Sequence, residues 1–451
     1  MRQDLFQKYD KPVPRYTSFP AVPHWDVANF TAQSWLQHLK KSFSKYSEEG
    51  ISLYIHLPYC ERLCTYCGCN KHITTNHAVE DPYIDAVLHE WKMYLEVLES
   101  KPLLRGIHLG GGTPTFFSAK NLERLLSGIL STAYVSADFE GSVEVHPTVT
   151  SFEQLAVLHN LGFSRLSAGV QDTDPVVQFI INRVQPNEET IRVVTDARNI
   201  GFQQINIDLV YGLPLQTFQS IQNTLKHVLE LSPDRIAYYG YAHVPWKSKG
   251  QRRYSETDLP SVETKRAMYL MANEILTKND YHAIGMDHFA KPDDPLFLAR
   301  AEGRLHRNFM GYTTQNTPLM IGLGASAISD CETAYSQNYK TPKEYLAILS
   351  QKILPVEKGH ILSQEDLQTK KHILNLMCYY QTCTNTIEDK EQRNIIQNRL
   401  SEMVADELLV IDNQDIKISP IGHPFVRNIA ACFDPYFNKQ ANDTPTFSKS
   451  I

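Results

Sequence analysis

Residues 60–70 read CERLCTYCGCN, and they follow the β-rich run ISLYIHL at residues 51–57. Four cysteines fall within ten positions here, at the spacing C-x-x-x-C-x-x-C-x-C, in a chain that holds only eight. A loop that leaves a strand with three cysteines at this spacing can bring its thiolates to one metal centre. Thiolates in that number suit an iron–sulfur cluster or zinc, so the stretch predicts a metal site at a strand end.

Other interpretations of the same loop remain open at this point. Zinc sites usually draw their ligands from two separated pairs, and the sequence has no second C-x-x-C. A redox pair formed by Cys64 and Cys67 is consistent with the spacing but leaves Cys60 unexplained. If three cysteines hold a four-iron cluster, one iron stays open for a substrate or cofactor. Spacing does not decide whether Cys69 is a bystander or a second functional group.

Composition narrows the class of protein. The chain has 451 residues, 42% of them hydrophobic and 21% charged, which is enough apolar material for more than one domain. Its net charge of -6 gives no basic field, so we expect no nucleic-acid partner and no membrane association. The N-terminus lacks the apolar run of a signal peptide, and we expect a cytoplasmic enzyme. In a reducing compartment, clustered cysteines favour metal ligands over disulfides.

Outward from the cysteine loop, a short β-rich run is repeatedly followed by a loop and a longer amphipathic stretch. Helical periodicity in those longer stretches indicates helices between the strands. This alternation predicts a parallel sheet wrapped by helices, an α/β barrel. The strand candidates are residues 51–57, 106–110, 142–146, 165–170, 205–212 and 235–243.

Three domains follow from these patterns. Residues 1–45 are interpreted as an N-terminal arm and helix packed on the barrel, and residues 46–360 as the barrel and its extension. Residues 361–451 predict a small C-terminal helical domain of winged-helix-like type. Many winged helices bind DNA, but this stretch is not basic enough to favour that role.

Polar residues stand at the predicted strand ends, at the rim where α/β barrels form their active sites. Because such a rim is shared by neighbouring strands, we expect these side chains to contribute to one site. The residues are His56, Glu144, Gln171, Asp208 and His243.

The spacing C-x-x-x-C-x-x-C after a first strand, followed by GGGTPT at 110–115, resembles the radical S-adenosylmethionine (SAM) enzymes. Further stretches are similar to the oxygen-independent coproporphyrinogen III dehydrogenase family. They are CGCN at 67–70, PRYTSFP at 14–20, IDLVYGLP at 207–214, GMDHFAKPDD at 285–294 and HRNFMGYTTQ at 306–315. The resemblance runs from about residue 13 to the C-terminus and implies a partial (β/α)6 barrel.

The resemblance also implies an activity. Cys60, Cys64 and Cys67 would hold a 4Fe-4S cluster, and the amine and carboxylate of SAM would bind its fourth iron. Reduction of the cluster would split SAM into methionine and a 5′-deoxyadenosyl radical, which removes a β-hydrogen from a propionate. Loss of CO2 and an electron then leaves a vinyl group. On rings A and B of coproporphyrinogen III this gives protoporphyrinogen IX in anaerobic heme biosynthesis.

The family binds two SAM molecules, and its contacts can be carried over by position. Tyr54, Gly111, Glu144 and Ile328 would contact the first SAM. The second would be contacted by Tyr66, Gly112, Thr113, Gln171, Arg183, Asp208 and Ala242. The catalytic set comprises the cluster cysteines with Cys69 and Tyr54. The glycines would let the backbone approach the cofactor.

Each of these side chains also has a purely structural interpretation. Tyr54 could be a strand aromatic, and Glu144 and Asp208 could cap helices. Arg183 could form a surface salt bridge.

The resemblance also implies an electron donor and a substrate site. A flavodoxin or ferredoxin would supply electrons to a monomer. The large apolar tetracarboxylate substrate would need local cations to bind its carboxylates. The candidates are Arg15, Lys71, Arg235, Lys247, Lys249, His306 and Arg307.

The sequence departs from the family pattern at Met310, where the family has Gln, and at His146, where it has Asp. A thioether cannot donate the hydrogen bond of an amide, so these departures bear on the substrate.

Three alternatives remain. A heme-binding chaperone on the same barrel is one, although the related chaperones generally lack the PRYTSFP arm and the cysteine at position 69, both present here. Another radical SAM reaction on a tetrapyrrole is the second. A non-catalytic zinc protein is the third, but zinc would not explain the glycine run.

Overall fold

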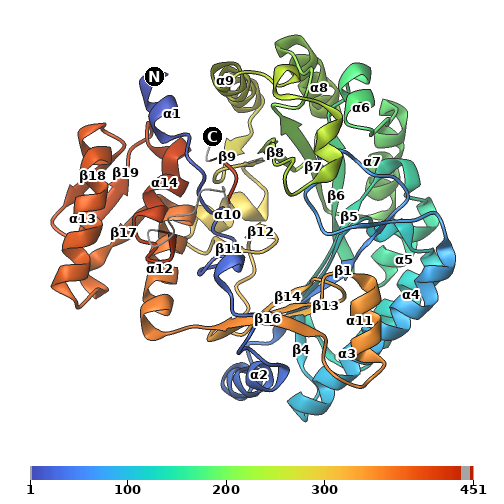
Figure 1. Cartoon of the computed structure of the whole chain (residues 1–451). Coiled ribbons are helices and arrows are strands. Elements are labelled where there is room, and N and C mark those ends of the chain that lie inside the picture. The colour runs from blue at the N-terminus through green and yellow to red at the C-terminus, as the bar shows by residue number, and fades with distance from the viewer. Residues whose placement is uncertain (1–2, 438–446, 450–451) are drawn as a thin grey trace.

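The computed structural model describes residues 3–437 and 447–449. Six parallel strands form its centre, with helices packed on their outer side (Figure 1). In sheet order they are β1 (Ile51–Leu57), β4 (Leu103–Gly111), β5 (Tyr134–Val145), β6 (Phe163–Gln171), β7 (Gln204–Tyr211) and β8 (Arg235–Gly240). Each overlaps one strand expected from the sequence. The α/β class and the partial (β/α)6 barrel are confirmed.

Four of the six connecting helices begin after a residue whose side chain caps the first turn. Thr217 accepts a hydrogen bond from the Ser220 amide and Ser151 accepts one from Gln154, each within a reciprocal capping box. The helices are α3 (Glu80–Leu98), α4 (Ala119–Leu130), α5 (Phe152–Asn160), α6 (Pro175–Ile180), α7 (Asn187–Ile200) and α8 (Phe218–Glu230). The apolar faces of α3, α4, α5 and α7 share one core with β1, β4, β5 and β6, whereas α8 packs with β7 and β8, and α6 belongs to a smaller cluster.

The sheet continues beyond the parallel strands on both edges, to twelve strands in all. On the β1 side it adds β13 (Leu319–Leu323), which is parallel to β1, then β14 (Ile328–Asp330), β15 (Ala334–Asn338) and β16 (Val356–Ile361). On the β8 side it adds β10 (His288–Ala290) and β9 (His282–Ala283), reached through α9 (Val262–Lys278). Nearby lie α10 (Pro295–Ala301) and the hairpin of β11 (His306–Asn308) and β12 (Gly311–Thr313), whereas α11 (Pro342–Leu349) packs against α3 on the other side of the sheet.

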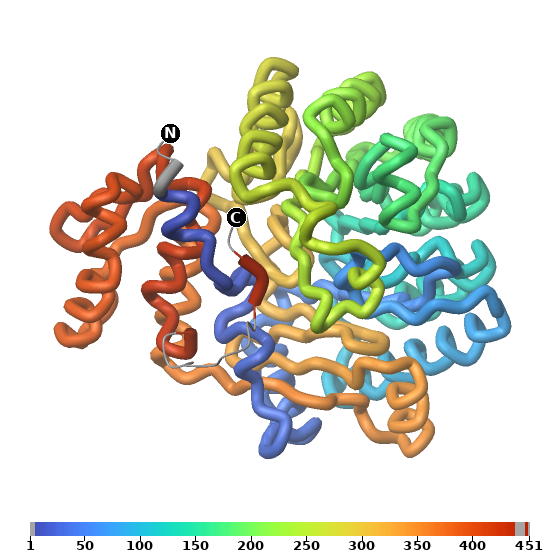
Figure 2. The backbone as a smooth tube through the Cα atoms, turned by 45° about the horizontal axis from the view of Figure 1, so that its top comes forward, coloured from blue at the N-terminus to red at the C-terminus, as the bar shows by residue number. Residues whose placement is uncertain are grey.

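The N-terminal segment, expected as an arm and helix packed on the barrel, divides between two cores. Helix α2 (Ala32–Tyr46) does pack there, through Trp35 and Leu39. Helix α1 (Gln3–Tyr9) and the following arm instead bury Leu5 and Phe6 against the C-terminal domain. The blue arm therefore joins the two parts of the molecule (Figure 2).

The C-terminal domain combines three helices with a three-stranded antiparallel sheet. Its elements are α12 (Gln364–Tyr379), β17 (Gln381–Cys383), α13 (Lys390–Ala405), β18 (Leu409–Asp412), β19 (Asp415–Ile418) and α14 (Val426–Ala431). The 3-10 turns are η1 (Val22–His24), η2 (His77–Val79), η3 (Pro114–Phe116), η4 (Pro147–Val149), η5 (Lys249–Arg253), η6 (Glu256–Asp258), η7 (Thr384–Thr386) and η8 (His423–Phe425). Within the described ranges, no helix has the length and apolarity needed to span a bilayer.

Candidate active site

The cysteine loop is closed at its base by a small parallel ribbon. Strand β2 (Tyr59–Cys60) pairs with β3 (His72–Ile73), which places Cys60 opposite Ile73. Two backbone hydrogen bonds fix the ends, from His72 to Pro58 at 2.7 Å and from Thr74 to Cys60 at 3.0 Å. The residues between are thereby held as one compact loop above the end of β1.

The thiols of the cysteine loop lie close enough to shift one another's pKa values. Burial raises the pKa of Cys60 to about 11, and the thiols of Cys64 and Cys67 add to that rise. The pKa of Cys67 is lowered to about 6, chiefly by a hydrogen bond with Cys69. The charges of Lys71 and Arg183 also lower this pKa, whereas burial opposes the decrease. A thiolate at position 67 is therefore favoured, and thiolates are the form that binds metal.

Across the described ranges, no three His, Cys, Asp or Glu side chains meet closely enough to hold a single metal ion. That finding concerns one ion at one point. Ligands of an iron–sulfur cluster bind separate iron atoms and do not need to meet.

The glycine run packs against the base of this loop. A Cβ on Gly112 would lie 2.6 Å from the Pro58 carbonyl oxygen, and one on Gly111, whose φ is +120°, would lie 2.9 Å from the His56 ring. The amide of Gly112 donates to Leu57 at 2.9 Å. These glycines are therefore required by the protein's own packing, a reason that the sequence interpretation had not considered.

Thr113 continues the contact between the glycine run and the loop. Its amide donates to the Tyr59 carbonyl at 3.0 Å. Its hydroxyl lies 3.3 Å from the sulfur of Cys60, within hydrogen-bonding distance. Gly112 and Thr113 thus lie at the base of the cysteine loop.

Tyr54, His56 and Glu144 form a network beneath the loop. The Nε2 of His56 lies 2.9 Å from the Asn70 carbonyl, so Nε2 carries the proton and donates it. Burial lowers the pKa of His56, and its neutral Nδ1 accepts from the Tyr54 hydroxyl at 3.0 Å. His56 thereby ties the far end of the cysteine loop to the strand that carries Tyr54.

Glu144 lies beside this network at the end of β5. Burial opposes its ionisation, but hydrogen bonds from His108 and the Gly111 amide outweigh that effect and hold the pKa of the carboxyl below its usual value. The Gly111 amide donates to Glu144 at 3.2 Å, and Tyr54 stacks on His108 with ring centroids 5.8 Å apart. Tyr54, Gly111 and Glu144 are thus brought together.

Ile328 approaches the same group from β14. Tyr54 is paired with Gly322 of β13, and a Cβ on Gly322 would lie 2.4 Å from the Ile328 carbonyl oxygen. The four residues expected at the first SAM therefore lie on neighbouring strands of one sheet, from β14 to β5.

Arg183 connects the cysteine loop to the opposite strands. Its guanidinium Nη1 lies 3.6 Å from the Cys64 sulfur, and its Nη2 donates to the Gly169 carbonyl. The residue is only 9% exposed, and its Nε has no hydrogen-bond partner. A buried guanidinium with an unsatisfied N–H is suited to an anionic ligand.

Gln171 and Asp208, also expected at the second SAM, lie beside Arg183. A Cβ on Gly169 would meet both Arg183 and Gln171, so those two side chains lie side by side. Asp208 is paired with Gly169 in the sheet, and burial followed by the charge of Glu144 raises its pKa to about 6. Gln171 has a φ of +71°, an unusual backbone conformation for a residue with a side chain.

Tyr66 and Ala242 are brought close by one glutamine. The side-chain amide of Gln251 donates to the Tyr66 carbonyl at 3.1 Å and to the Ala242 carbonyl at 3.2 Å. Gly112 and Thr113 instead contact Leu57, Tyr59 and Cys60, so the second group divides between the loop base and the Arg183 side.

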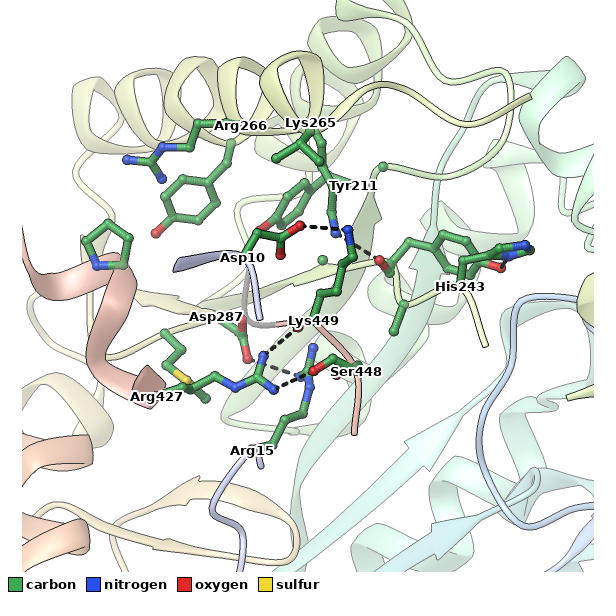
Figure 3. A pocket seen from close by; sticks show the side chains of 18 of the residues that line it. Asp10, Arg15, Tyr211, His243, Lys265, Arg266, Asp287, Arg427, Ser448 and Lys449 are labelled. Atoms are coloured by element: carbon green, nitrogen blue, oxygen red, sulfur yellow. Dashed lines mark hydrogen bonds and ion pairs between the residues drawn. The ribbon is translucent and has the colours of Figure 1, made fainter. Parts of the chain in front are cut away.

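A cavity of about 600 Å³ opens next to Ala242, between the barrel rim, the N-terminal arm and the C-terminal domain. Figure 3 shows charged side chains from all three parts around it. Its cations are Arg15, Lys265, Arg266, Arg427 and Lys449, against the acids Asp10, Glu256 and Asp287. Tyrosines such as Tyr211 and Tyr269 supply flat walls.

The cations repel one another within this cavity. Burial lowers the pKa of Lys265 to about 8, with Asp10 opposing and Arg15, Arg427 and Lys449 adding to the decrease. A ligand with several carboxylates would relieve that repulsion. The cavity volume falls in the range of organic ligand sites.

Most of the cations expected at the substrate lie elsewhere. Arg235 forms a buried ion pair with Asp294 at 2.7 Å. Arg307 is buried beneath the arm and donates to the Arg15 carbonyl at 3.4 Å. Of the seven candidates, only Arg15 lines the large cavity, whereas Arg235 and Arg307 contact the protein's own groups.

The structure also places His146 and Met310, the two departures from the family pattern. His146 lies at the end of β5, where burial and the charges of Arg183 and Arg62 lower its pKa to about 3. Met310 lies at the turn between β11 and β12, and its amide donates to the Asn308 side chain at 2.9 Å. Neither residue lines the cavity.

The model of the Radical SAM superfamily matches residues 54–228, from Tyr54 on β1 to helix α8. The chain is 38% identical over 448 residues to the oxygen-independent coproporphyrinogen III oxidase of Escherichia coli (strain K12), covering 97% of this chain and 96% of that protein. The chain belongs to this oxidase family.

Two further comparisons agree. The oxidase from Helicobacter pylori (strain ATCC 700392 / 26695) is 38% identical over 444 residues, or 96% of each chain. A solved structure of the Escherichia coli coproporphyrinogen III oxidase, described as a radical SAM enzyme, matches with a TM-score of 0.89 at 36% identity. The match covers 94% of this chain and 100% of that chain.

Membership of the oxidase family brings a 4Fe-4S cluster and SAM as cofactors. The site fits both groups. The loop of Cys60, Cys64 and Cys67 offers thiolates. The unsatisfied Nε of Arg183, beside Cys64, offers a donor to a carboxylate.

Two features of the oxidase site were missed in the sequence. His108 lies within a strand next to Tyr54, and its polar character at a register position facing the rim was the available signal. Lys265 and Arg427 lie on α9 and α14, far from every motif, so only the folded chain brings them to the cavity.

Proposed function

We propose that this chain catalyses the anaerobic oxidative decarboxylation of the ring A and ring B propionates of coproporphyrinogen III, giving protoporphyrinogen IX. The observation that carries the proposal is its full-length likeness to curated oxygen-independent coproporphyrinogen III oxidases, at 38% identity over 97% of the chain. Each propionate loses one β-hydrogen atom, one electron and CO2, and becomes a vinyl group. The product serves heme biosynthesis.

Cys60, Cys64 and Cys67 would hold the cluster, and Cys69 would adjust the charge of Cys67 through their hydrogen bond. When bound and reduced, the cluster supplies the electron that splits SAM and generates the hydrogen-abstracting radical. Thr113 supports Cys60, and the His56 bond to Asn70 holds the opposite end of the loop. The loop is therefore braced at both ends.

Tyr54, Gly111, Glu144 and Ile328 would contact one SAM. Glu144 is held ionised by His108 and the Gly111 amide, so it can accept hydrogen bonds from an ammonium or a ribose. Tyr54 presents an aromatic face whose hydroxyl is committed to His56.

A second SAM would contact Tyr66, Gln171, Arg183, Asp208 and Ala242, with Gly112 and Thr113 at the loop base. The planar fork of Arg183 can bind both oxygens of a carboxylate. Asp208, with a pKa raised to about 6, can donate or accept a proton near neutral pH.

The cavity would hold the tetrapyrrole. Lys265, Arg15, Arg427 and Lys449 would pair with its carboxylates, and Tyr211 and Tyr269 would cover its pyrrole rings. The arm and the C-terminal domain supply part of the cavity walls. A flavodoxin or ferredoxin would supply electrons to a cytoplasmic monomer.

The test is anaerobic reconstitution with iron and sulfide, followed by incubation with SAM, dithionite and coproporphyrinogen III. We expect CO2, 5′-deoxyadenosine and a porphyrin with two vinyl groups. Stable heme binding without release of CO2 would support the chaperone alternative and overturn this proposal.

A further inference from the structure

The outer side of the cysteine loop forms one continuous surface with α6 and η5. The side-chain amide of Asn182, just after α6, donates to the Leu63 carbonyl at 2.8 Å. From the other side, Gln251 of η5 donates to the Tyr66 carbonyl at 3.1 Å. The blue cysteine loop and the yellow-green segment that precedes α9 lie side by side (Figure 2). These contacts hold the three segments together as one face.

Apolar side chains occupy the centre of this face. Phe179 on α6 is 65% exposed, and Leu63 of the cysteine loop is 38% exposed. Gly250 joins them, because a Cβ there would lie 3.6 Å from the Leu63 side chain. The Arg253 guanidinium lies 5.4 Å from the Phe179 ring centroid. These two exposed side chains offer a partner an apolar contact at the centre of the face.

Basic residues surround that apolar centre. Residues 247–253 read KSKGQRR, with four cations and no acid, in a chain whose net charge is -6. Arg62, Lys249, Arg252 and Arg253 are all exposed. The neighbouring acid Glu61 is directed towards His77, at 3.7 Å. The face is therefore a local positive patch on a negative protein.

The face is separate from the proposed tetrapyrrole cavity. The cavity lining includes Val244 and Trp246 and continues at Glu256, so the residues of η5 do not line it. The face instead adjoins Cys64, which directly follows the exposed Leu63. Cys64 is thus one residue from the surface of this face.

We propose that this loop face, formed by Arg62, Leu63, Phe179, Lys249, Arg252 and Arg253, is the docking site of a small acidic protein that carries one low-potential electron. This inference rests on the proposed function, because the face would be the contact through which the cluster receives an electron. In the step, the carrier is oxidised by one electron and the cluster takes up that electron, with no proton or bond exchanged. Charge complementarity would steer the acidic partner, and Leu63 and Phe179 would pack against its surface.

The test uses flavodoxin in two measurements with the variant R252E/R253E. The first is the affinity of flavodoxin for the protein at low ionic strength, followed by flavin fluorescence. The second is the rate at which flavodoxin hydroquinone is oxidised by the reconstituted enzyme. We expect both to weaken by at least about tenfold, because charge steering changes association rates by about 10- to 1,000-fold. The wild-type affinity should fall as salt is added.

Two controls make the outcome specific. K101E/K278E reverses two exposed lysines near the starts of β4 and β9 and should bind flavodoxin like the wild type. Phe179→Ser removes the apolar centre without a charge change and should also weaken binding. With dithionite in place of flavodoxin, R252E/R253E should form product at the wild-type rate.

Equal binding and oxidation by wild type and R252E/R253E would overturn the docking proposal. Failure of the proposed function would look different, because wild-type protein with dithionite would then release no CO2. The flavodoxin affinity would still decide the docking site in that case.

Discussion

The guanidinium of Arg183 lies 3.6 Å from the sulfur of Cys64, although 119 residues separate them in the chain. Arg183 follows helix α6, and Cys64 belongs to the loop after β1. Their contact joins the cysteine loop to the strand ends that carry Gln171 and Asp208. A positive group beside a proposed cluster ligand can serve a bound carboxylate and the cluster loop together.

Replacing Arg183 tests that double role. Arg183→Gln should weaken SAM binding by about 10- to 100-fold, the loss of a charge-assisted hydrogen bond worth about 1.5–3 kcal/mol. Equilibrium dialysis with labelled SAM measures it. Arg124→Gln removes a surface arginine on α4 and should leave the affinity unchanged. Unaltered SAM affinity in Arg183→Gln would remove this residue from the cofactor site.

Gly112 tests the packing of the cysteine loop. In Gly112→Ala the new Cβ would meet the Pro58 carbonyl oxygen at 2.6 Å, so the loop base must shift. We expect the reconstituted variant to bind less iron and to lose absorbance of the cluster. Gly68→Ala is the matched control within the same loop, because a Cβ there has nothing within 4 Å. Equal iron content in the two variants would contradict the packing account.

The buried carboxyl of Glu90 predicts how stability changes with pH. Burial raises its pKa to about 7, while hydrogen bonds from Tyr345, the Gly324 amide and Asn338 limit the rise. The folded state therefore binds this proton more tightly than the unfolded state, and stability is lost as pH rises from about 4.5 to 7.

Glu90→Gln stays neutral and should remove that dependence. Between pH 5 and pH 8, the wild type should lose up to about 3 kcal/mol more stability than the variant. Thermal or urea unfolding at both pH values measures the difference. A parallel pH dependence in wild type and variant would show that Glu90 does not cause it.

Lys265 tests the proposed substrate cavity. Lys265→Gln should raise the KM for coproporphyrinogen by at least about tenfold, because one charge-assisted contact to a carboxylate is lost. With its pKa lowered to about 8, Lys265 loses its proton as pH rises through 8, so the wild-type KM should rise there. Lys278→Gln changes an exposed lysine on the same helix and should have no effect. Steady-state kinetics with saturating SAM measure the KM of each variant. An equal KM in Lys265→Gln and Lys278→Gln would contradict the proposed substrate cavity.

The sequence was sufficient for the features that depend on local patterns. Strand periodicity located β1 at its observed bounds, residues 51–57, and the cysteine spacing indicated the loop above it. The rim position of Glu144 followed from its place at a strand end. Local periodicity and parallel-sheet geometry account for these successes.

Long-range packing accounts for what the sequence did not reveal. Nothing near Leu5 or Phe6 indicated that the arm would pack on a domain formed by residues beyond 360. Arg307 lies in a recognisable motif, yet it is buried under the arm, while Lys265 and Arg427 lie in no motif and reach the cavity. Such partners are separated by hundreds of residues and are set by tertiary contacts.

The central claim is that Cys60, Cys64 and Cys67 hold an iron–sulfur cluster whose reduction drives decarboxylation. The most direct measurement is CO2 release from coproporphyrinogen III by anaerobically reconstituted protein, compared with the variant C60S/C64S/C67S. We predict two CO2 per tetrapyrrole, with SAM consumed, for the wild type, and neither CO2 nor cluster absorbance for the variant. Full activity in the variant, or reconstituted wild type without cluster absorbance, would contradict the account.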